Sequence, residues 1–424
     1  MKIAVVGSGI SGLAAAWYLG QDHQVTVCER GRYIGLDAHS VEVEATGSRV
    51  HLNAPMRVFY EGYYPTLSEL YRDIGVAYES VNYSASFSPY GHRAYFRYKN
   101  YWLGRITLPF LAGPSLRTAG AWGLGLEIAL FLRRLRQLDL HSIPDSMTFE
   151  DYLERSGCSK RLVQDFLYPA MAGICTCSYQ SVADYPAAIM LGYLARDLTW
   201  SRVNRLTHGV QDVACRLSAA ADDIQLGLDV KYIVANEDKV ELHDGRGYRE
   251  RFDHVVVATQ ANQARSLLPE AMAAERSVLA SFDYEGSRLQ IHNDQRLAPV
   301  DQRDWAPVNF LLSQAHRKPM ASIWLNAIYP ELTDAAPMFE TWNPFTEVDH
   351  EHVMVDAWVE RPVVTARSLN AIEQLERLQA QEDRRVWFCG SYAYRGIPLL
   401  ESAVASGKDI AQKITGLNRR VQAR

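Results

Sequence analysis

The chain has 424 residues, of which 48% are hydrophobic and 22% charged, and its formal net charge is −5. This length exceeds what one hydrophobic core usually covers and the composition carries no signature of disorder, so we expect a globular protein of two domains. The acidic balance and the lack of a basic run exclude the electrostatic footprint of a nucleic-acid or anionic-lipid binder, which favours a small-molecule partner.

The N-terminus and the cysteines allow predictions of where the protein is located and whether it binds a metal. The N-terminus runs from Lys2 straight into an apolar stretch without a signal-peptide pattern, which predicts a cytoplasmic location. The cysteines are scattered, and Cys175 and Cys177 have no partner at metal-site spacing, so we predict reduced thiols and no metal. Residues 120–132 are too short for the ~20 apolar residues of a membrane span. They predict a buried or amphipathic helix beside an apolar pocket, and no transmembrane segment.

The first thirty residues predict a βαβ unit. Residues 3–8 are an apolar strand, 11–20 a helix and 24–29 a second strand of alternating valines and polar residues. A glycine-rich turn, GSGISG, joins the first strand to the helix. This order of strand, glycine turn, helix and strand is typical of a dinucleotide-binding domain.

Four residues of this unit have the spacing of a dinucleotide site. Gly7 permits the tight turn, Gly9 lets the backbone approach a pyrophosphate, and Gly12 lets the helix pack closely on the strand. Glu29 ends the second strand, where it would accept hydrogen bonds from the adenosine ribose and disfavour the 2′-phosphate of NADP. The motif predicts a dinucleotide cofactor and, by itself, leaves FAD and NAD open.

The next elements in the chain are mostly helical. Residues 66–74 and 148–156 are predicted helices, and Thr148 and Asp151 have the spacing of a capping box at the start of the second. The Tyr- and Ser-rich segment between them alternates as strands do.

The second half returns to Rossmann-like patterns. Residues 209–221 predict a helix, 224–242 are strand-like, and the valines at 255–257 predict a strand of a parallel sheet covered on both faces. Residues 285–375 mix strands with turns. The end, RVWFCGSYAYRGIPLLESAVASGKDIAQKI, reads as strand, glycine turn and helix. Such pieces at the start, middle and end predict domains that are discontinuous in sequence.

Several segments resemble FAD-dependent amine oxidase-like flavoproteins. ERGRYIGLDAHSVEVE resembles the stretch after their second strand, HGVQDVACRL and DHVVVATQANQARSLL their central segment, and FCGSYAYRGIPLLESAVASGKDIA their closing flavin motif. LQIHNDQRLAPVDQRDWAPVNF, SIWLNAIYP and ETWNPF are similar to a branch known as predicted NAD/FAD-binding oxidoreductases. The resemblance implies an α/β fold in which a Rossmann-like FAD-binding domain is joined to a second, α+β substrate domain.

The same resemblance implies how the chain is divided. The FAD-binding domain would be built from residues 1–75, 205–265 and 381–424. The substrate domain would consist of the two insertions, residues 76–204, which are partly helical, and 266–380.

The resemblance also assigns residues to noncovalent FAD. Val230 would meet the adenine through backbone atoms, and Gly390 and Ser391 would contact the pyrophosphate or ribityl chain. The last helix would begin beside the flavin, where its dipole favours negative charge. The implied cofactor residues are Gly7, Gly9, Gly12, Glu29, Arg30, Gly35, Val230, Gly390, Ser391, Pro398, Leu399 and Leu400.

The sequence departs from the superfamily pattern at three places. Leu36 and Asp37 stand where a second glycine and a basic residue are usual, which puts the phosphate contacts there in doubt. His208 replaces the first glycine of a pair before the central helix. The strand SRLQIHND contains Arg288 and His292 but not the lysine that many amine oxidases place near flavin N5, so we predict that this chain is not a lysine-type amine oxidase.

Three residues are predicted for the substrate cavity. Tyr392 and Tyr394 follow the pyrophosphate glycine and would line an apolar cavity, with core packing as the alternative. Arg57 lies in a segment that resembles the loop past the isoalloxazine, where it would stabilise anionic flavin or bind a substrate carboxylate. A surface ion pair is the alternative for this arginine. Trp305, Trp342 and Asn343 are weaker candidates for the cavity.

These observations predict an FAD-dependent oxidoreductase that removes hydride from a mainly apolar small organic substrate. One alternative is an FAD-dependent double-bond isomerase of an unsaturated lipid, with no net redox change. Another is a non-catalytic flavin-binding protein. An NAD-dependent dehydrogenase comes last, because the C-terminal motif has no role in such an enzyme. The residues leave the substrate, the electron acceptor and the oligomeric state open.

Overall fold

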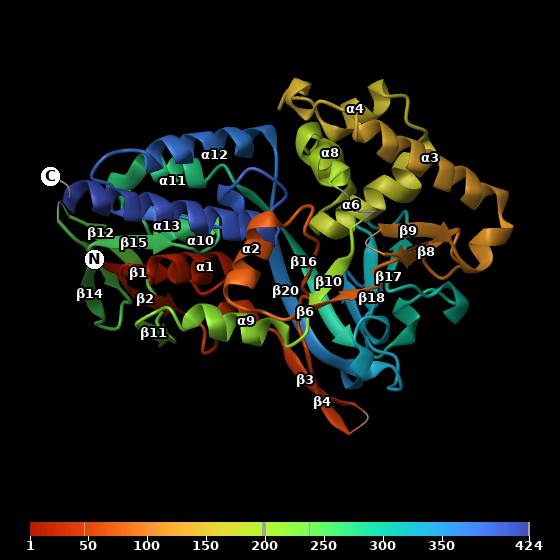
Figure 1. Ribbon diagram of the computed structural model, residues 1–424, viewed down its shortest axis with the longest axis horizontal. Coiled ribbons are helices and arrows are strands. Elements are labelled where there is room, and N and C mark those ends of the chain that lie inside the picture. Colours follow the sequence, from red (N-terminus) through yellow and green to blue (C-terminus); the bar gives the residue numbers. More distant parts are fainter. Residues whose placement is uncertain (46, 105, 197–200, 237, 423–424) are drawn as a thin grey trace.

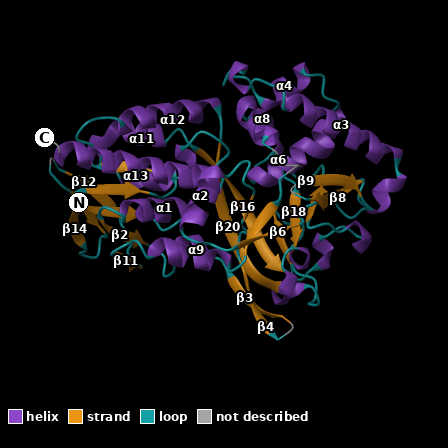
Figure 2. Ribbon diagram, in the orientation of Figure 1, coloured by secondary structure: helices purple, strands orange, loops and turns teal. Residues whose placement is uncertain are grey.

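Two sheets, formed by segments far apart in the chain, organise the computed structural model (Figure 1). The structure describes residues 1–45, 47–104, 106–196, 201–236 and 238–422. Figure 2 shows the long strands β16 (Asp283–His292) and β20 (Val353–Val363) in the middle of the molecule, between two groups of helices. The architecture is the mixed α/β fold with a Rossmann-like part and a second sheet that the sequence predicts.

The first sheet has five parallel strands. In spatial order they are β11 (Asp223–Leu226), β2 (Gln24–Glu29), β1 (Lys2–Val6), β15 (His254–Val257) and β21 (Val386–Phe388). The valines of β15 are 0% exposed because the sheet is covered on both faces, Val256 lying in one buried apolar cluster and Val255 and Val257 in another. The buried parallel strand predicted from those valines is confirmed.

The second sheet has eight strands and mixed directions. Its edge on the side of the first sheet is formed by β20 and β16, and its far edge by a hairpin. In spatial order it contains β20, β16, β19 (Phe339–Trp342), β18 (Met320–Trp324), β17 (Val308–Leu312), β7 (Ala85–Pro89), β8 (Phe96–Leu103) and β9 (Ile106–Leu111).

Three small sheets complete the strands. The strand-like segment predicted over residues 224–242 is divided between β11 and one of these sheets. Their members are β5 (Val58–Phe59), β10 (Val203–Leu206) and β6 (Tyr78–Val81); β12 (Tyr232–Ala235), β13 (Val240–His243) and β14 (Arg249–Phe252); and β3 (Val41–Ala45) with β4 (Ser48–Leu52).

Helices α1 (Ile10–Leu19) and α13 (Leu400–Gln422) pack against each other over the five-stranded sheet. Small residues allow this close approach, since a Cβ atom on Gly407 would lie 2.6 Å from the carbonyl oxygen of Ser11. The remaining helices are α2 (Pro65–Asp73), α4 (Phe149–Arg155), α5 (Lys160–Leu162), α6 (Tyr168–Cys175), α7 (Tyr179–Asp184), α8 (Ala187–Ala195), α9 (Gly209–Ser218), α10 (Ala261–Leu267), α11 (Ala273–Leu279), α12 (Ala366–Gln379) and α3, described below.

The predicted helices are present with shifted ends. The capping box of α4 is formed as predicted, with Thr148 Oγ1 accepting from Asp151 N at 3.1 Å and Asp151 Oδ2 accepting from Thr148 N at 3.3 Å. The helix predicted at 209–221 ends at Ser218, where the chain turns into β11.

Helix α3 (Ala119–Leu135) is the amphipathic helix predicted at 120–132, extended at both ends. Leu124 and Phe131 are buried, whereas Trp122, Leu126 and Leu130 are exposed. Within the part of the chain that the structure describes, no helix combines the length and apolar character needed to cross a membrane.

Candidate cofactor and substrate site

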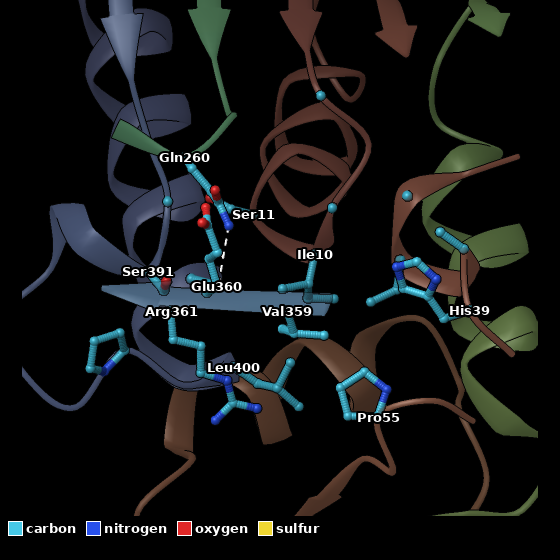
Figure 3. A pocket seen from close by; sticks show the side chains of 18 of the residues that line it. Ile10, Ser11, His39, Pro55, Gln260, Val359, Glu360, Arg361, Ser391 and Leu400 are labelled. Atoms are coloured by element: carbon cyan, nitrogen blue, oxygen red, sulfur yellow. Dashed lines mark hydrogen bonds between the residues drawn. The ribbon is translucent and has the colours of Figure 1, made fainter. Parts of the chain in front are cut away.

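A cavity of about 1200 Å³ connects the two sheets. At one end it is lined by the carboxyl ends of β1, β2 and β15, where open parallel sheets bind ligands. At the other end its wall is apolar and comes from β17, β18 and β19, through Val308, Phe310, Ala321, Ile323 and Trp342. Figure 3 shows β20 crossing this cavity, with Glu360 and Arg361 extending from opposite faces of the strand.

The glycine turn between β1 and α1 exposes backbone to the cavity. Gly7 has φ +104, and its N–H donates to Cys28 O at 2.8 Å, which holds the turn against β2. A Cβ atom on Gly9 would meet nothing within 4 Å, so this residue faces open space. Gly12 does not line the cavity, because it packs inward: a Cβ atom there would lie 2.0 Å from Gly7 O.

Glu29 fixes the loops around this turn. Its Oε2 accepts from Ser8 N at 2.9 Å and from Ser8 Oγ at 2.6 Å, and its Oε1 accepts from Gly31 N at 2.7 Å. Ser8 Oγ in turn accepts from Gly35 N at 2.7 Å. Glu29, Arg30 and Gly35 all line the cavity, so the carboxylate positions the backbone that a nucleotide would meet.

The unusual residues after Gly35 do not obstruct this end. Leu36 and His39 line the cavity, but Asp37 is absent from its lining, and Asp37 Oδ1 lies 3.2 Å from His51 Nε2. Asp37 therefore does not place its carboxylate in the cavity lining, because His51 of β4 lies beside it.

The structure explains why the second glycine before α9, Gly209, is kept when the first is His208. Gly209 has φ +69, and a Cβ atom on it would lie 2.9 Å from Asn53 Oδ1. That oxygen accepts from Val210 N at 3.0 Å and so satisfies a free N–H at the start of the helix. Neither His208 nor Gly209 lines the cavity.

The C-terminal motif brings a second helix start to the same cavity. Gly390 and Ser391 line it from the turn after β21, Pro398, Leu399 and Leu400 line it at the N-terminal end of α13, and Val230 lines it from the loop before β12. The starts of α1 and α13 thus face one space, and both helix dipoles favour negative charge there. Glu401 does not add a charge to this space, because its carboxylate accepts from Thr66 N and Leu67 N, each at 3.0 Å.

The two candidate tyrosines lie in different environments. Tyr392 lines the cavity, is 3% exposed and packs on Phe282 with ring centroids 4.9 Å apart. Its hydroxyl is buried without a partner among the described residues, and burial raises the pKa of Tyr392 well above its ordinary value. Tyr394 is 41% exposed and lies outside the cavity lining, so its predicted place is wrong. The chain turns outward after Ser391–Ala393.

The unpartnered hydroxyl makes a test of Tyr392 possible. We expect Tyr392→Phe to change the free energy of unfolding of the cofactor-free protein by less than about 0.5 kcal/mol, because no protein hydrogen bond is lost. Urea unfolding measures this value. A loss above about 1 kcal/mol would show that the hydroxyl has a partner inside the protein.

Arg57 is half-buried among charged residues at the cavity and is not part of a surface ion pair. It lines the cavity together with Glu340 and Arg361, neither of which was predicted from the sequence. Burial, and secondly the charge of Arg361, lower the pKa of Arg57 to about 10. Burial raises the pKa of Glu340 to about 7. Glu340 and Trp342 are two residues apart in β19 and so share one face of the strand. The acid two residues before a tryptophan predicted for the cavity was therefore the sequence signal that could have identified Glu340.

The other sequence candidates lie outside the cavity lining. Trp305 is buried against Phe339, and its Nε1 donates to Pro299 O at 2.8 Å. Asn343 lies at the end of β19 with φ +51. Arg288 pairs with Asp356 and Glu347 on the outer side of the sheet. His292 is buried against Thr341, and burial lowers its pKa to about 4.

A family model described as an NAD(P)-binding Rossmann-like domain matches residues 5–74. No curated protein matches the sequence. Among solved structures, a triple mutant of putrescine oxidase made to redesign cofactor binding is 14% identical, with a TM-score of 0.66 over 98% of each chain. A CLA-producing fatty acid isomerase from P. acnes is 16% identical, with a TM-score of 0.66 over 97% of this chain and 98% of that one.

A third similar structure is cyclohexylamine oxidase from Brevibacterium oxydans, at 15% identity and a TM-score of 0.65 over 99% of each chain. At these identities the similarity establishes the fold over nearly the whole chain, and the chemistry has to be argued from the residues of the site.

Proposed function

The chain has the fold of the amine oxidase-like flavoproteins, and from this premise we propose that it is an FAD-dependent oxidoreductase acting on a mainly apolar small organic substrate. The observation that carries the proposal is that one continuous cavity joins two helix starts to an apolar wall. The similar structures are named as enzymes of small molecules, namely putrescine oxidase, cyclohexylamine oxidase and a fatty acid isomerase.

The residues of the cavity fit FAD. The open space at Gly9 admits a pyrophosphate beside the start of α1, and Glu29 stands at the end of β2 where a ribose would lie. The N–H groups at the start of α13 offer donors further along the cavity. Bound flavin would supply the hydride acceptor, and the chain's share is to orient the substrate and exclude water.

The site residues support noncovalent binding. Cys389 is 0% exposed and lies outside the cavity lining, and burial raises the pKa of its thiol to about 12, so it is an unreactive group. His39 is the histidine that lines the cavity among the described residues. We place the protein in the cytoplasm as a prediction from its sequence.

The visible absorption spectrum of the purified protein tests the proposal. We expect flavin absorption, release of the flavin into the supernatant on acid precipitation, and bleaching by an oxidisable substrate under anaerobic conditions. Flavin that stays in the precipitate would contradict noncovalent binding. A colourless protein that takes up NAD but not FAD would contradict the proposal as a whole, and one that binds FAD but never bleaches would favour a non-catalytic role.

A second candidate is the double-bond isomerase. The observation in its favour is that the fatty acid isomerase matches this fold as closely as the amine oxidases do. Mass spectrometry of the product separates the two, because oxidation removes two hydrogens and isomerisation leaves the mass unchanged. Turnover without any consumption of an electron acceptor would favour the isomerase.

A further inference from the structure

Three charged side chains, Arg57, Glu340 and Arg361, line the cavity beside its apolar wall. Glu340 is 0% exposed; its Oε2 accepts from Met56 N at 2.7 Å, and its Oε1 accepts from Trp342 Nε1 at 3.1 Å. The first bond ties Glu340 to the loop of Arg57. The ring of Trp342 lies 5.4 Å from the guanidinium carbon of Arg361. The bond to Met56 N therefore fixes the backbone next to Arg57, and the Trp342 ring packs against the Arg361 guanidinium.

The cluster has more positive than negative charge. Two guanidinium groups face one carboxylate, and Glu360, the next acid on β20, leaves the opposite face of that strand (Figure 3). Arg57 Nε is buried without a hydrogen-bond partner among the described residues. Arg361 donates one N–H to Ile174 O at 3.1 Å. A guanidinium has five N–H donors, so others can bind a ligand.

Apolar groups surround these cations. Phe310, Ile323 and Ile174 line the same cavity, and the wall is closely packed, since a Cβ atom on Gly173 would lie 2.5 Å from the Phe310 ring. In such surroundings an uncompensated guanidinium attracts an anion strongly and repels a cation. The planar fork of arginine matches a carboxylate in particular.

Resting on the proposed function, we propose that Arg57 and Arg361 bind the carboxylate of the substrate, so that the substrate class is an apolar carboxylic acid and not an amine. Glu340 is a positioning residue in this site, because its hydrogen bonds are made to Met56 N and Trp342 and not to the ligand. The cationic wall also explains why a fold shared with amine oxidases would reject a protonated amine here.

Ligands that share one alkyl chain test the substrate class without any mutation. We would titrate the protein as purified with decanoate, decanol, decylamine and decyl phosphate. The readout is the change in tryptophan fluorescence, to which Trp342 and Trp358 contribute from the cavity lining, together with the flavin spectrum when flavin is present. We expect decanoate to bind at least tenfold more tightly than decanol, with decylamine the weakest. Decylamine or decanol binding as tightly as decanoate would overturn the inference, as would tighter binding of decyl phosphate.

Variants then identify the anchor. Arg57→Gln and Arg361→Gln should each weaken decanoate binding about ten- to a hundredfold and leave decanol binding unchanged. Arg288→Gln is the matched control, since this arginine lies in the same sheet but outside the cavity lining. Variants that lose flavin while keeping the preference for decanoate would show that the cations serve the cofactor, and would overturn the inference.

Different results would contradict the proposed function and the proposed carboxylate site. A protein that carries FAD but shows no preference for decanoate keeps the proposed function and loses the carboxylate site. A protein that prefers decanoate by tryptophan fluorescence but takes up no FAD loses the proposed function only.

Discussion

Replacing Gly12 by alanine should destabilise the protein by roughly 2–3 kcal/mol and abolish cofactor binding, whereas the same change at Gly9 should weaken cofactor binding with little loss of stability. A Cβ atom on Gly12 would lie 2.0 Å from Gly7 O and 3.1 Å from Ala258 Cβ, so α1 has to move away from the sheet. Because Gly7 belongs to the turn that faces the cavity, this movement also displaces the backbone that meets the phosphates.

Gly9→Ala is the matched variant because its added methyl group meets no protein atom within 4 Å. Its backbone, with φ −68 and ψ 175, suits alanine, and we expect the free energy of unfolding to change by no more than about 1 kcal/mol. The methyl group nevertheless enters the space where a pyrophosphate would approach, which should lower FAD affinity at least tenfold.

Urea unfolding and FAD titration of the two variants separate these effects. If Gly9→Ala binds FAD like the wild type, the phosphates do not lie at this turn. If Gly12→Ala unfolds like the wild type, the close packing of α1 on the sheet is not needed for stability.

The βαβ unit was predictable because its signals are local. The glycine turn, the strand before it and Glu29 are close in sequence, and the structure shows the strand and helix order that their spacing predicts. The buried strand β15 was predictable for the same reason, since its three valines are consecutive.

The charged cluster was not predictable in this way. Arg57 comes from an early loop, Glu340 from β19 and Arg361 from β20, and β16 lies between those two strands in the sheet. Sequence spacing does not reveal this order, because the sheet places β7 beside β17, β18 and β19, from which a long insertion separates it in the sequence. Asp37 shows the same limit on a smaller scale, because its partner His51 comes from another element.

The buried carboxyl of Glu340 should make folding stability depend on pH. Its pKa rises from 4.5 to about 7 on burial, so the folded protein binds this proton more tightly than the unfolded chain does. The contribution to stability is complete below pH 4.5, declines as the pH rises toward 7, and is lost above it. The full loss is about 3 kcal/mol, at about 1.4 kcal/mol for each tenfold change in the ionisation constant.

Glu340→Gln isolates this effect, because glutamine does not titrate. The variant begins with a constant offset, since the glutamine NH₂ group must face one of the two donors, Met56 N or Trp342 Nε1. The difference in unfolding free energy between variant and wild type should still shift by about 3 kcal/mol in favour of the variant between pH 4.5 and 8.

The charged and titratable groups that act on Glu340 keep their protonation states between pH 4.5 and 8. Arg57 has a pKa of about 10, burial raises the pKa values of Tyr83 and Tyr329, and Arg361 stays a cation in this range. Urea unfolding of both proteins in the same cofactor state, at pH 5 and pH 8, measures the shift. Parallel pH dependences would mean that Glu340 is ionised throughout, in which case its carboxylate balances one of the two arginines and the excess positive charge at the cavity is one and not two.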